Sequence, residues 1–263
     1  MSRSVLITGA GSGIGAACAQ RLAHQGWQVA LLGRRRAALE QVAQACGGLV
    51  LAGDAADSAA WPAFIGQLRE RFGGLDAVIA CAGGHGLGRA GDIDDAAWRA
   101  ALRSNLDSAF QTARACLPLL RERQGSLVLL GSIASLAAGP EVCGYTTAKH
   151  ALIGLTRSLA RDYGPDGVRV NCVCPGWVRT PMADQEMQAL MSHYQEDLEA
   201  AYRRVSADVP LRRAASSDEI AAVCQFLVGS DASIVTGAVI TADGGATVVD
   251  VPTLAYARLA PQP

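Results

Sequence analysis

Short apolar segments typical of buried β-strands alternate with amphipathic helical patterns along the whole chain. This alternation predicts an α/β fold with a doubly wound parallel sheet, because each parallel strand needs a helical crossover before the next. The strand cores are apolar without alternation, so helices should cover both faces of the sheet. We expect about seven strands, over residues 4–8, 28–32, 49–51, 77–80, 126–130, 169–173 and 238–241.

No linker rich in Ser, Pro or Gly divides the 263 residues. We therefore expect one domain over residues 1–250, followed by a C-terminal tail over 251–263. The longest helical patterns cover 97–121 and 145–163. The segment 177–213 interrupts the alternation of strand and helix patterns, and its length, mixed charge and methionines predict a lid. The alternative is a peripheral pair of helices that takes no part in an active site.

Composition argues against several classes of function. The chain has 23 basic and 24 acidic residues, so it lacks the basic field that nucleic acids require. No apolar run approaches the roughly 18 residues of a membrane span, and the N-terminus shows no signal segment. Eight cysteines without C-x-x-C spacing and four unclustered histidines predict reduced thiols and no metal. We expect a cytoplasmic protein that binds neither nucleic acid nor membranes.

The first predicted strand runs directly into a glycine-rich turn that opens a helix. Glycines allow a tight turn and a close backbone approach, and the free N–H groups of a helix N-terminus attract phosphate. This strand-turn-helix context predicts a dinucleotide site rather than a merely structural turn. The turn reads Thr8-Gly9-Ala10-Gly11-Ser12-Gly13-Ile14-Gly15.

The end of the second strand indicates which dinucleotide is bound. Arg34 and Arg35 stand where an NAD site carries an acid for the ribose 2′-hydroxyl. Arginine at this place accommodates the 2′-phosphate of NADP. The pair therefore favours NADP(H), with NAD(H) as the other candidate cofactor.

A Tyr-x-x-x-Lys pattern opens the second long helix. The i, i+4 spacing places the Tyr145 phenol and the Lys149 ammonium on one face. A cation beside a phenol stabilises the phenolate, which suits a general acid/base. Lys149 is the single lysine beside 22 arginines, so we expect its position to reject arginine. Ser132 follows the fifth strand, at the sheet edge where ligands of open α/β sheets bind.

Together these motifs resemble the short-chain dehydrogenase/reductases, in their compact single-domain branch, which includes 3-oxoacyl-carrier-protein reductases. The resemblance covers residues 4–245 and implies a Rossmann-type fold. The matching positions are Thr8, Gly9, Gly13, Gly15, Asp54, Asn105, Ser132, Tyr145, Lys149, Pro175, Gly176, Thr180, Asp243, Gly244 and Gly245.

The resemblance also implies catalytic functions for four residues. Tyr145 would exchange a proton with the substrate oxygen, and Ser132 would hydrogen-bond that oxygen. Lys149 would support the phenolate and hold the nicotinamide ribose. Asn105 would hold a relay water, although Asn is also common at helix bends.

Cofactor contacts follow from the same resemblance. Asp54 would meet the adenine, and the turn from Pro175 to Thr180 would cradle the nicotinamide, with a helix cap as the alternative for Thr180. The family usually has Asn-Asn-Ala-Gly where this chain has Ala80-Cys81-Ala82-Gly83, and we interpret Cys81 as packing rather than as a redox thiol. The predicted contacts are Gly9, Ser12, Gly13, Ile14, Gly15, Arg34, Arg35, Asp54, Ala82, Gly83, Asn105, Tyr145, Lys149, Pro175, Gly176, Val178 and Thr180.

We therefore predict an NADP(H)-dependent oxidoreductase that interconverts a ketone and a secondary alcohol. The alternatives are an NAD(H)-dependent sugar, polyol or hydroxysteroid dehydrogenase, a catalytically silent nucleotide-binding protein, and an epimerase-like relative. We expect a homodimer or homotetramer that associates through the two long helices. The predicted substrate pocket comprises His85, Ser132, Glu141, Tyr145 and Trp177.

Overall fold

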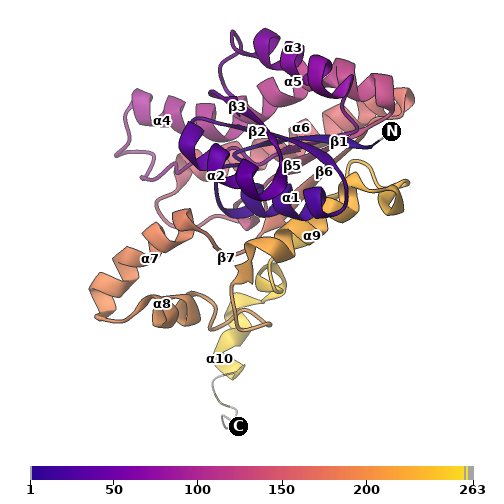
Figure 1. Ribbon diagram of the computed structural model, residues 1–263. Coiled ribbons are helices and arrows are strands. Elements are labelled where there is room, and N and C mark those ends of the chain that lie inside the picture. The colour runs from indigo at the N-terminus through magenta and orange to yellow at the C-terminus, as the bar shows by residue number, and fades with distance from the viewer. Residues whose placement is uncertain (1, 258, 260–263) are drawn as a thin grey trace.

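The computed structural model describes residues 2–257 and 259 and contains a seven-stranded parallel sheet (Figure 1). The strand order is β3-β2-β1-β4-β5-β6-β9, so the order reverses between β1 and β4. This arrangement confirms the predicted doubly wound, Rossmann-type fold class. The strands are β1 (Ser4–Thr8), β2 (Gln28–Gly33), β3 (Leu49–Ala52), β4 (Ala77–Ala80), β5 (Ser126–Leu130), β6 (Arg169–Pro175) and β9 (Val239–Ala242).

Two hydrophobic cores lie on opposite faces of this sheet. Successive side chains of a strand point to opposite faces. Leu6 of β1 therefore packs into one core, while its neighbours Val5 and Ile7 pack into the other. The first core is completed by α3 (Trp61–Phe72), α5 (Ser108–Arg123) and α6 (Cys143–Tyr163). The second is completed by α1 (Gly13–His24), α2 (Arg36–Cys46) and α9 (Ser217–Val228).

The helix predicted over 97–121 is divided into three parts. It consists of α4 (Asp95–Leu102), a π-helical turn (Arg103–Asp107) and α5. Within the turn, the buried Asn105 side chain donates from Nδ2 to the Ala101 carbonyl at 3.0 Å. A side chain that bonds a carbonyl four residues back competes with the helical ladder, which explains the widened turn. The other long helix, α6, begins at Cys143 rather than at Tyr145.

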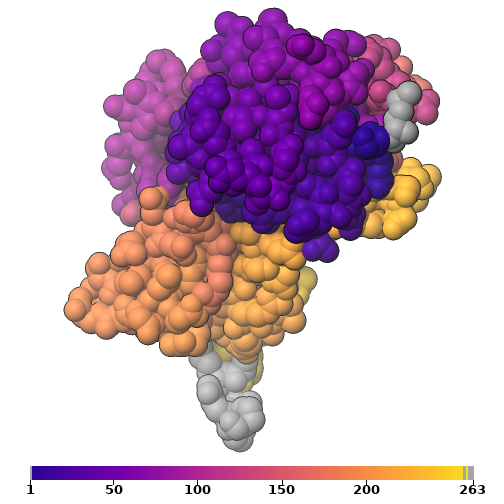
Figure 2. Space-filling view, in the orientation of Figure 1, coloured from indigo at the N-terminus to yellow at the C-terminus, as the bar shows by residue number. Residues whose placement is uncertain are grey.

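The segment 177–213 contains a pair of helices with a small core of their own. Thr180 and Asp197 cap α7 (Pro181–Tyr194) and α8 (Leu198–Val205). Figure 2 shows this pair as an orange lobe that projects beside α9. Two short parallel strands, β7 (Val178–Arg179) and β8 (Ala215–Ser216), flank the pair. The core of the lobe comprises Ala183, Met187, Ala201, Tyr202 and Ala214.

Only part of the predicted C-terminal tail lies within the described residues. It contains a short helix, α10 (Leu254–Ala257), and exposes Val251, Tyr256 and Leu259. Within the described residues, no helix combines the length and the apolarity that crossing a membrane requires. In residues 2–257 and 259, no group of three or more His, Cys, Asp and Glu side chains is placed to hold a metal ion.

Asn171 fastens β6 to the loop that precedes β9. It is fully buried, and its Nδ2 donates to the Val235 carbonyl at 2.8 Å while its Oδ1 accepts from the Ala238 amide at 3.1 Å. Asn171→Leu leaves both backbone groups without these partners. We expect the free energy of unfolding to fall by about 2–4 kcal/mol, measured by denaturant titration. An unchanged unfolding midpoint would show that the two Asn171 hydrogen bonds contribute nothing to the stability of the fold.

Candidate active site

Lys149 connects the end of β5 to the phenol ring of Tyr145. Its side chain is only 5% exposed. Its Nζ donates to the Leu130 carbonyl at 2.8 Å and lies 5.5 Å from the centroid of the Tyr145 ring. The structure thus brings the ammonium, the phenol and the loop that carries Ser132 together at the carboxyl edge of the sheet. Parallel sheets of this kind bind their ligands at that edge.

Ser132 begins a single 3₁₀ turn, Ile133–Ser135, directly after β5. Its Oγ accepts from the Ala134 amide at 3.1 Å, and its own amide donates to the Ser135 Oγ at 3.2 Å. These reciprocal bonds form a capping box, which fixes the orientation of the Ser132 side chain. Because the hydroxyl oxygen is an acceptor here, its hydrogen is left to be donated to a ligand.

Asn105 lies next to Lys149, on the other side of Gly83. Its Oδ1 accepts from the Gly84 amide at 3.2 Å. A Cβ atom on Gly83 would lie 3.1 Å from the Asn105 Oδ1 and 3.7 Å from the Lys149 Nζ. The π-helical turn therefore delivers a buried amide to the same edge as the Tyr-Lys pair. Asn105 both widens the helix and faces the site, so its two predicted functions are compatible.

A thiol pair lies beneath the Ser132 loop, and the sequence analysis did not single it out. The Sγ atoms of Cys172 and Cys174 are 3.9 Å apart, on the same face of β6. A Cβ atom on Gly131 would lie 2.9 Å from each sulfur. The Cys172 thiol lowers the pKa of Cys174, with help from the Ser135 hydroxyl, the Ser132 amide and the Lys149 charge, and these effects outweigh burial, which acts to raise it. Only the i, i+2 spacing on a strand indicated this pair beforehand.

The glycine turn follows β1 at the same edge of the sheet. Gly9 and Gly13 have φ angles of 65° and 54°, a region that favours glycine. A Cβ atom on Gly15 would lie 2.4 Å from the Gly9 carbonyl oxygen, so this position excludes any side chain. Ser12 precedes α1 without a side-chain hydrogen bond to its first turn, where Ile14 also lies. The first amides of α1 are therefore left to bind an anion such as pyrophosphate.

The loop after β4 packs against this turn. The Ala82 amide donates to the Thr8 Oγ1 at 3.0 Å, and a Cβ atom on Gly9 would lie 3.0 Å from the Ala82 Cα. Cys81 packs against the core that contains α1 and α9. Its surroundings support the interpretation that Cys81 fills space.

Charged side chains gather at the tips of β2 and β3. Arg34 and Arg35 are exposed, and the Arg35 Nη2 donates to the Ser12 Oγ at 3.2 Å. The Asp54 Oδ1 accepts from the Ala56 amide at 2.9 Å, while its Oδ2 accepts from the Arg103 Nη2 at 2.8 Å. Burial acts to raise the pKa of Asp54, but the Ala56 amide and the Arg103 guanidinium outweigh it and lower that pKa.

The turn between β6 and α7 lies beside the glycine turn. A Cβ atom on Gly13 would lie 3.0 Å from the Thr180 Cγ2. The Thr180 Oγ1 also accepts from the Ala183 amide at 3.2 Å, so it caps α7 as the alternative prediction held. Pro175 ends β6, and the Gly176 backbone packs closely against Asp243. Val178 is buried in β7.

The remaining predicted pocket residues, His85, Glu141 and Trp177, lie on different segments of the chain. The His85 Nδ1 lies 3.1 Å from the Glu186 Oε1, a contact between the loop after β4 and α7. Trp177 packs against the core of the helix pair. Glu141 is exposed, with a φ of 56°, and its carbonyl accepts from the Gly88 amide at 2.6 Å. Sequence reasoning missed Glu186, because only the fold brings α7 to His85.

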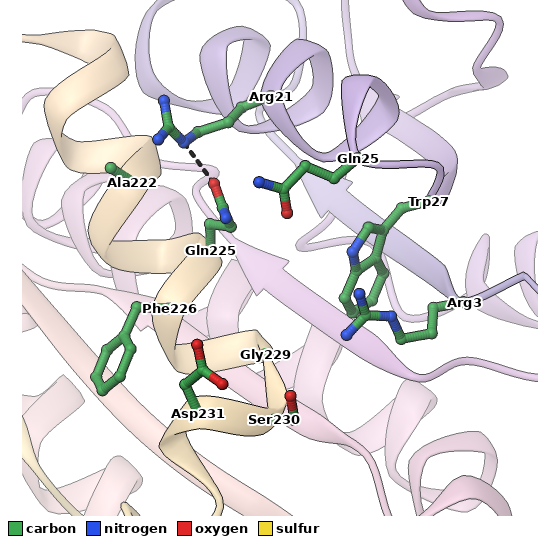
Figure 3. Close-up of a pocket in the computed structure, with 10 residues that line it drawn as sticks. All are labelled: Arg3, Arg21, Gln25, Trp27, Ala222, Gln225, Phe226, Gly229, Ser230 and Asp231. Carbon is green, nitrogen blue, oxygen red and sulfur yellow. Dashed lines mark hydrogen bonds between the residues drawn. The ribbon is translucent and has the colours of Figure 1, made fainter.

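A separate hollow lies between α1 and α9, at the amino edge of the sheet (Figure 3). Arg3 precedes β1 and stacks on Trp27 at 4.3 Å, and Arg21 bonds Gln225 across the hollow. None of the predicted site residues lines it. It lies at the edge opposite to Ser132, so it is not the candidate active site.

Comparison with known proteins identifies the family of the chain. A family model described as enoyl-(acyl carrier protein) reductase matches residues 9–247. The chain belongs to the short-chain dehydrogenase/reductase family. Membership confirms the predicted activity class, an NAD(P)-dependent oxidoreductase that acts on CH–OH groups.

Three relatives illustrate the range of this family. Protein MoaE of Klebsiella aerogenes is 52% identical, over 98% of this chain and all of its own length. Meso-2,3-butanediol dehydrogenase of Serratia marcescens is 34% identical, over 95% of this chain and 96% of its own. The structure of L-sorbose reductase from Gluconobacter frateurii, complexed with NADPH and L-sorbose, is 28% identical. It superimposes with a TM-score of 0.86, covering 93% of this chain and 96% of the reductase.

Gly15 offers a direct test of the dinucleotide groove. Gly15→Ala places a methyl group against the Gly9 carbonyl, so the turn must open and the N-terminus of α1 must move. We expect NADPH affinity, measured by fluorescence titration, to fall at least about tenfold, because the amides no longer converge. Gly66→Ala is the matched control, since nothing lies within 4 Å of its added Cβ in α3. Equal affinity in both variants would argue against a phosphate site at this turn.

Proposed function

We propose that this enzyme interconverts a ketone and a secondary alcohol with NADP(H), using Tyr145 as its acid/base. The observation that carries the proposal is the buried Lys149 ammonium, held by the Leu130 carbonyl and placed 5.5 Å from the Tyr145 ring centroid. Ser132 follows Leu130 at the same edge. A nicotinamide cofactor, when bound, supplies the hydride, and the protein must orient it and manage one proton.

Tyr145 and Lys149 carry out the proton transfer that accompanies hydride transfer. In the reducing direction the Tyr145 hydroxyl donates its proton to the substrate oxygen, and the Lys149 charge stabilises the phenolate that remains. One ammonium hydrogen is bonded to Leu130, which leaves two for the nicotinamide ribose and a relay water. The Asn105 Oδ1 would hold that water. This route would return a proton from solvent without moving the phenol.

Ser132 orients the substrate. Its capping box fixes the side chain, and its free hydrogen would bond the substrate oxygen opposite Tyr145. Two donors at one carbonyl stabilise the charge that develops on oxygen during hydride transfer. The presence of Ser132, Tyr145 and Lys149 together argues against the catalytically silent alternative.

Arg34 and Arg35 support NADP(H) over NAD(H). Both are exposed at the tip of β2, and Arg35 lies within hydrogen-bond distance of Ser12, the residue before α1. A phosphate beside α1 would therefore meet two guanidinium groups and a hydroxyl. The L-sorbose reductase structure, which contains NADPH, adds support. An NAD(H)-dependent polyol or sugar dehydrogenase remains the second candidate, which the similarity to meso-2,3-butanediol dehydrogenase favours.

The substrate pocket would lie between the Ser132 loop, His85 and the helix pair of segment 177–213. We propose this segment as the lid, with His85 and Glu186 bridging the entrance. A panel of ketones and alcohols, followed by cofactor absorbance, identifies the substrate class. The single domain over 1–250, the homodimer or homotetramer and the cytoplasmic location stay predictions.

Tyr145→Phe removes the proton donor and almost no volume. We expect kcat to fall by about 10² to 10⁴, the range for loss of a general acid or base, while NADPH still binds. Single-turnover kinetics and fluorescence titration measure the two effects separately. Near-normal turnover in this variant would refute the assigned chemistry.

Lys149→Arg tests whether a positive charge at position 149 is enough for catalysis. The Lys149 Nζ is nearly enclosed, and a Cβ atom on Gly83 would lie only 3.7 Å away, so the broader guanidinium must displace the loop after β4. We expect kcat/KM to fall by about 10², as for a misplaced catalytic group. Arg99→Lys, on the exposed face of α4, is the control for a simple cation exchange. Full activity in Lys149→Arg would show that catalysis does not require lysine at position 149.

Cofactor preference can be measured directly. We expect kcat/KM to be higher with NADPH than with NADH, and Arg34→Ala together with Arg35→Ala to reduce that ratio by about tenfold or more. Arg36→Ala is the control, because Arg36 pairs with Glu40 along α2. A clear preference of the unmodified enzyme for NADH would contradict the proposal.

A further inference from the structure

Arg103 and Asp54 form an ion pair that the family pattern did not predict. Asp54 follows β3, and Arg103 begins the π-helical turn between α4 and α5. The two are joined at 2.8 Å, with the side chains 52% and 37% exposed. An isolated surface pair of this kind adds little to the stability of the fold. Its position in the molecule is therefore a better guide to its function.

The pair lies at the far end of the proposed cofactor groove. The amides of α1 would hold the pyrophosphate, and Arg34 and Arg35 at the tip of β2 would hold the ribose. β3 is the next strand beyond β2, and the Gly53 amide bonds the Gly33 carbonyl at 2.9 Å, which joins the two tips. A base attached to that ribose would therefore meet Asp54. This step rests on the proposed function.

Asp54 has the chemistry that an adenine amine requires. The exocyclic amine of adenine is a hydrogen-bond donor and needs an acceptor. The Asp54 carboxylate offers about four lone-pair positions, of which the Ala56 amide and the Arg103 guanidinium use two. Together the amide and the guanidinium lower the pKa of Asp54, so the group is ionised at neutral pH and acts only as an acceptor.

We propose that Arg103 is a positioning residue for cofactor recognition, holding the Asp54 carboxylate so that it accepts the exocyclic amine of adenine. The terminal torsion of an aspartate is broad, so one contact leaves the carboxylate free to rotate. The Ala56 amide fixes one oxygen, and Arg103 fixes the other. The carboxylate plane is set only when both contacts are present.

The π-helical turn gives this arrangement a second consequence. Arg103 and Asn105 belong to the same turn, and Asn105 bonds the Gly84 amide near Lys149. One local widening of the helix thus places a side chain at each end of the groove. The adenine end and the nicotinamide end are thereby aligned by the same five residues.

Base-selective binding tests this proposal without requiring turnover. NADPH is compared with nicotinamide hypoxanthine dinucleotide phosphate, which carries an oxo group in place of the adenine amine. Affinities come from fluorescence titration of the unmodified enzyme, Arg103→Met, Arg103→Lys and Asp54→Asn. Arg99→Met is the matched control, because Arg99 forms a similar exposed pair with Asp95 one turn earlier in α4. NADH and its hypoxanthine analogue repeat the comparison, so that the 2′-phosphate does not enter the result.

We expect the unmodified enzyme and Arg99→Met to prefer the adenine form, and Arg103→Met to lose about tenfold of that preference. Arg103→Lys should retain part of it. In the double variant Arg103→Met, Asp54→Asn, the losses should not add, because both changes affect one contact. Melting temperatures should be alike in the two arginine-to-methionine variants.

Three results would overturn the proposal. The first is no preference between bases in the unmodified enzyme, and the second is an undiminished preference in Arg103→Met. The third is an equal loss of affinity for both bases, which would assign Arg103 to the phosphates. Failure of every dinucleotide to bind would instead remove the proposed function, and this inference with it.

Discussion

The buried ammonium of Lys149 is the interaction on which the rest of the site depends. A buried charge is costly unless it is hydrogen-bonded, and the Leu130 carbonyl at the end of β5 supplies the bond at 2.8 Å. That carbonyl is free for the purpose because the strand ends there. The requirement to satisfy the ammonium ties α6 to the sheet edge. It thereby fixes how far Tyr145 stands from the loop of Ser132.

Small residues make this close arrangement possible. A Cβ atom on Gly86 would lie 2.5 Å from the Tyr145 amide, and one on Gly144 would lie 2.7 Å from the Ala101 Cβ. The loop after β4 therefore packs backbone against backbone on the start of α6, and α4 contacts Gly144 through the Ala101 methyl group. Close packing of this kind transmits any shift of one segment to the others. The position of the phenol is a property of three elements rather than of α6 alone.

The segments that would bind ligands are supported by different hydrophobic cores. The glycine turn and the Lys149 contacts rest on the two cores of the sheet. The helix pair α7 and α8 instead has a separate small core, reached through the turn at Thr180. Its contact with the loop after β4 includes the His85 to Glu186 pair. A separate core of this kind is compatible with the lid that we propose for segment 177–213.

The family resemblance added the prediction for Ser132, whereas the sequence by itself determined the fold class, the glycine turn and the spacing of Tyr145 and Lys149. These features are local, since hydrophobic period, turn chemistry and i, i+4 spacing act within a few residues. Only the tertiary structure placed Arg103 on Asp54, Glu186 on His85 and Cys174 under Gly131, because each pair joins distant segments. The π-helical turn also escaped the sequence, since the periodicity of the chain continues through it. Within it, the Asn105 amide and the Ser104 hydroxyl both donate to the Ala101 carbonyl, and such side-chain bonds to the backbone compete with the helical ladder.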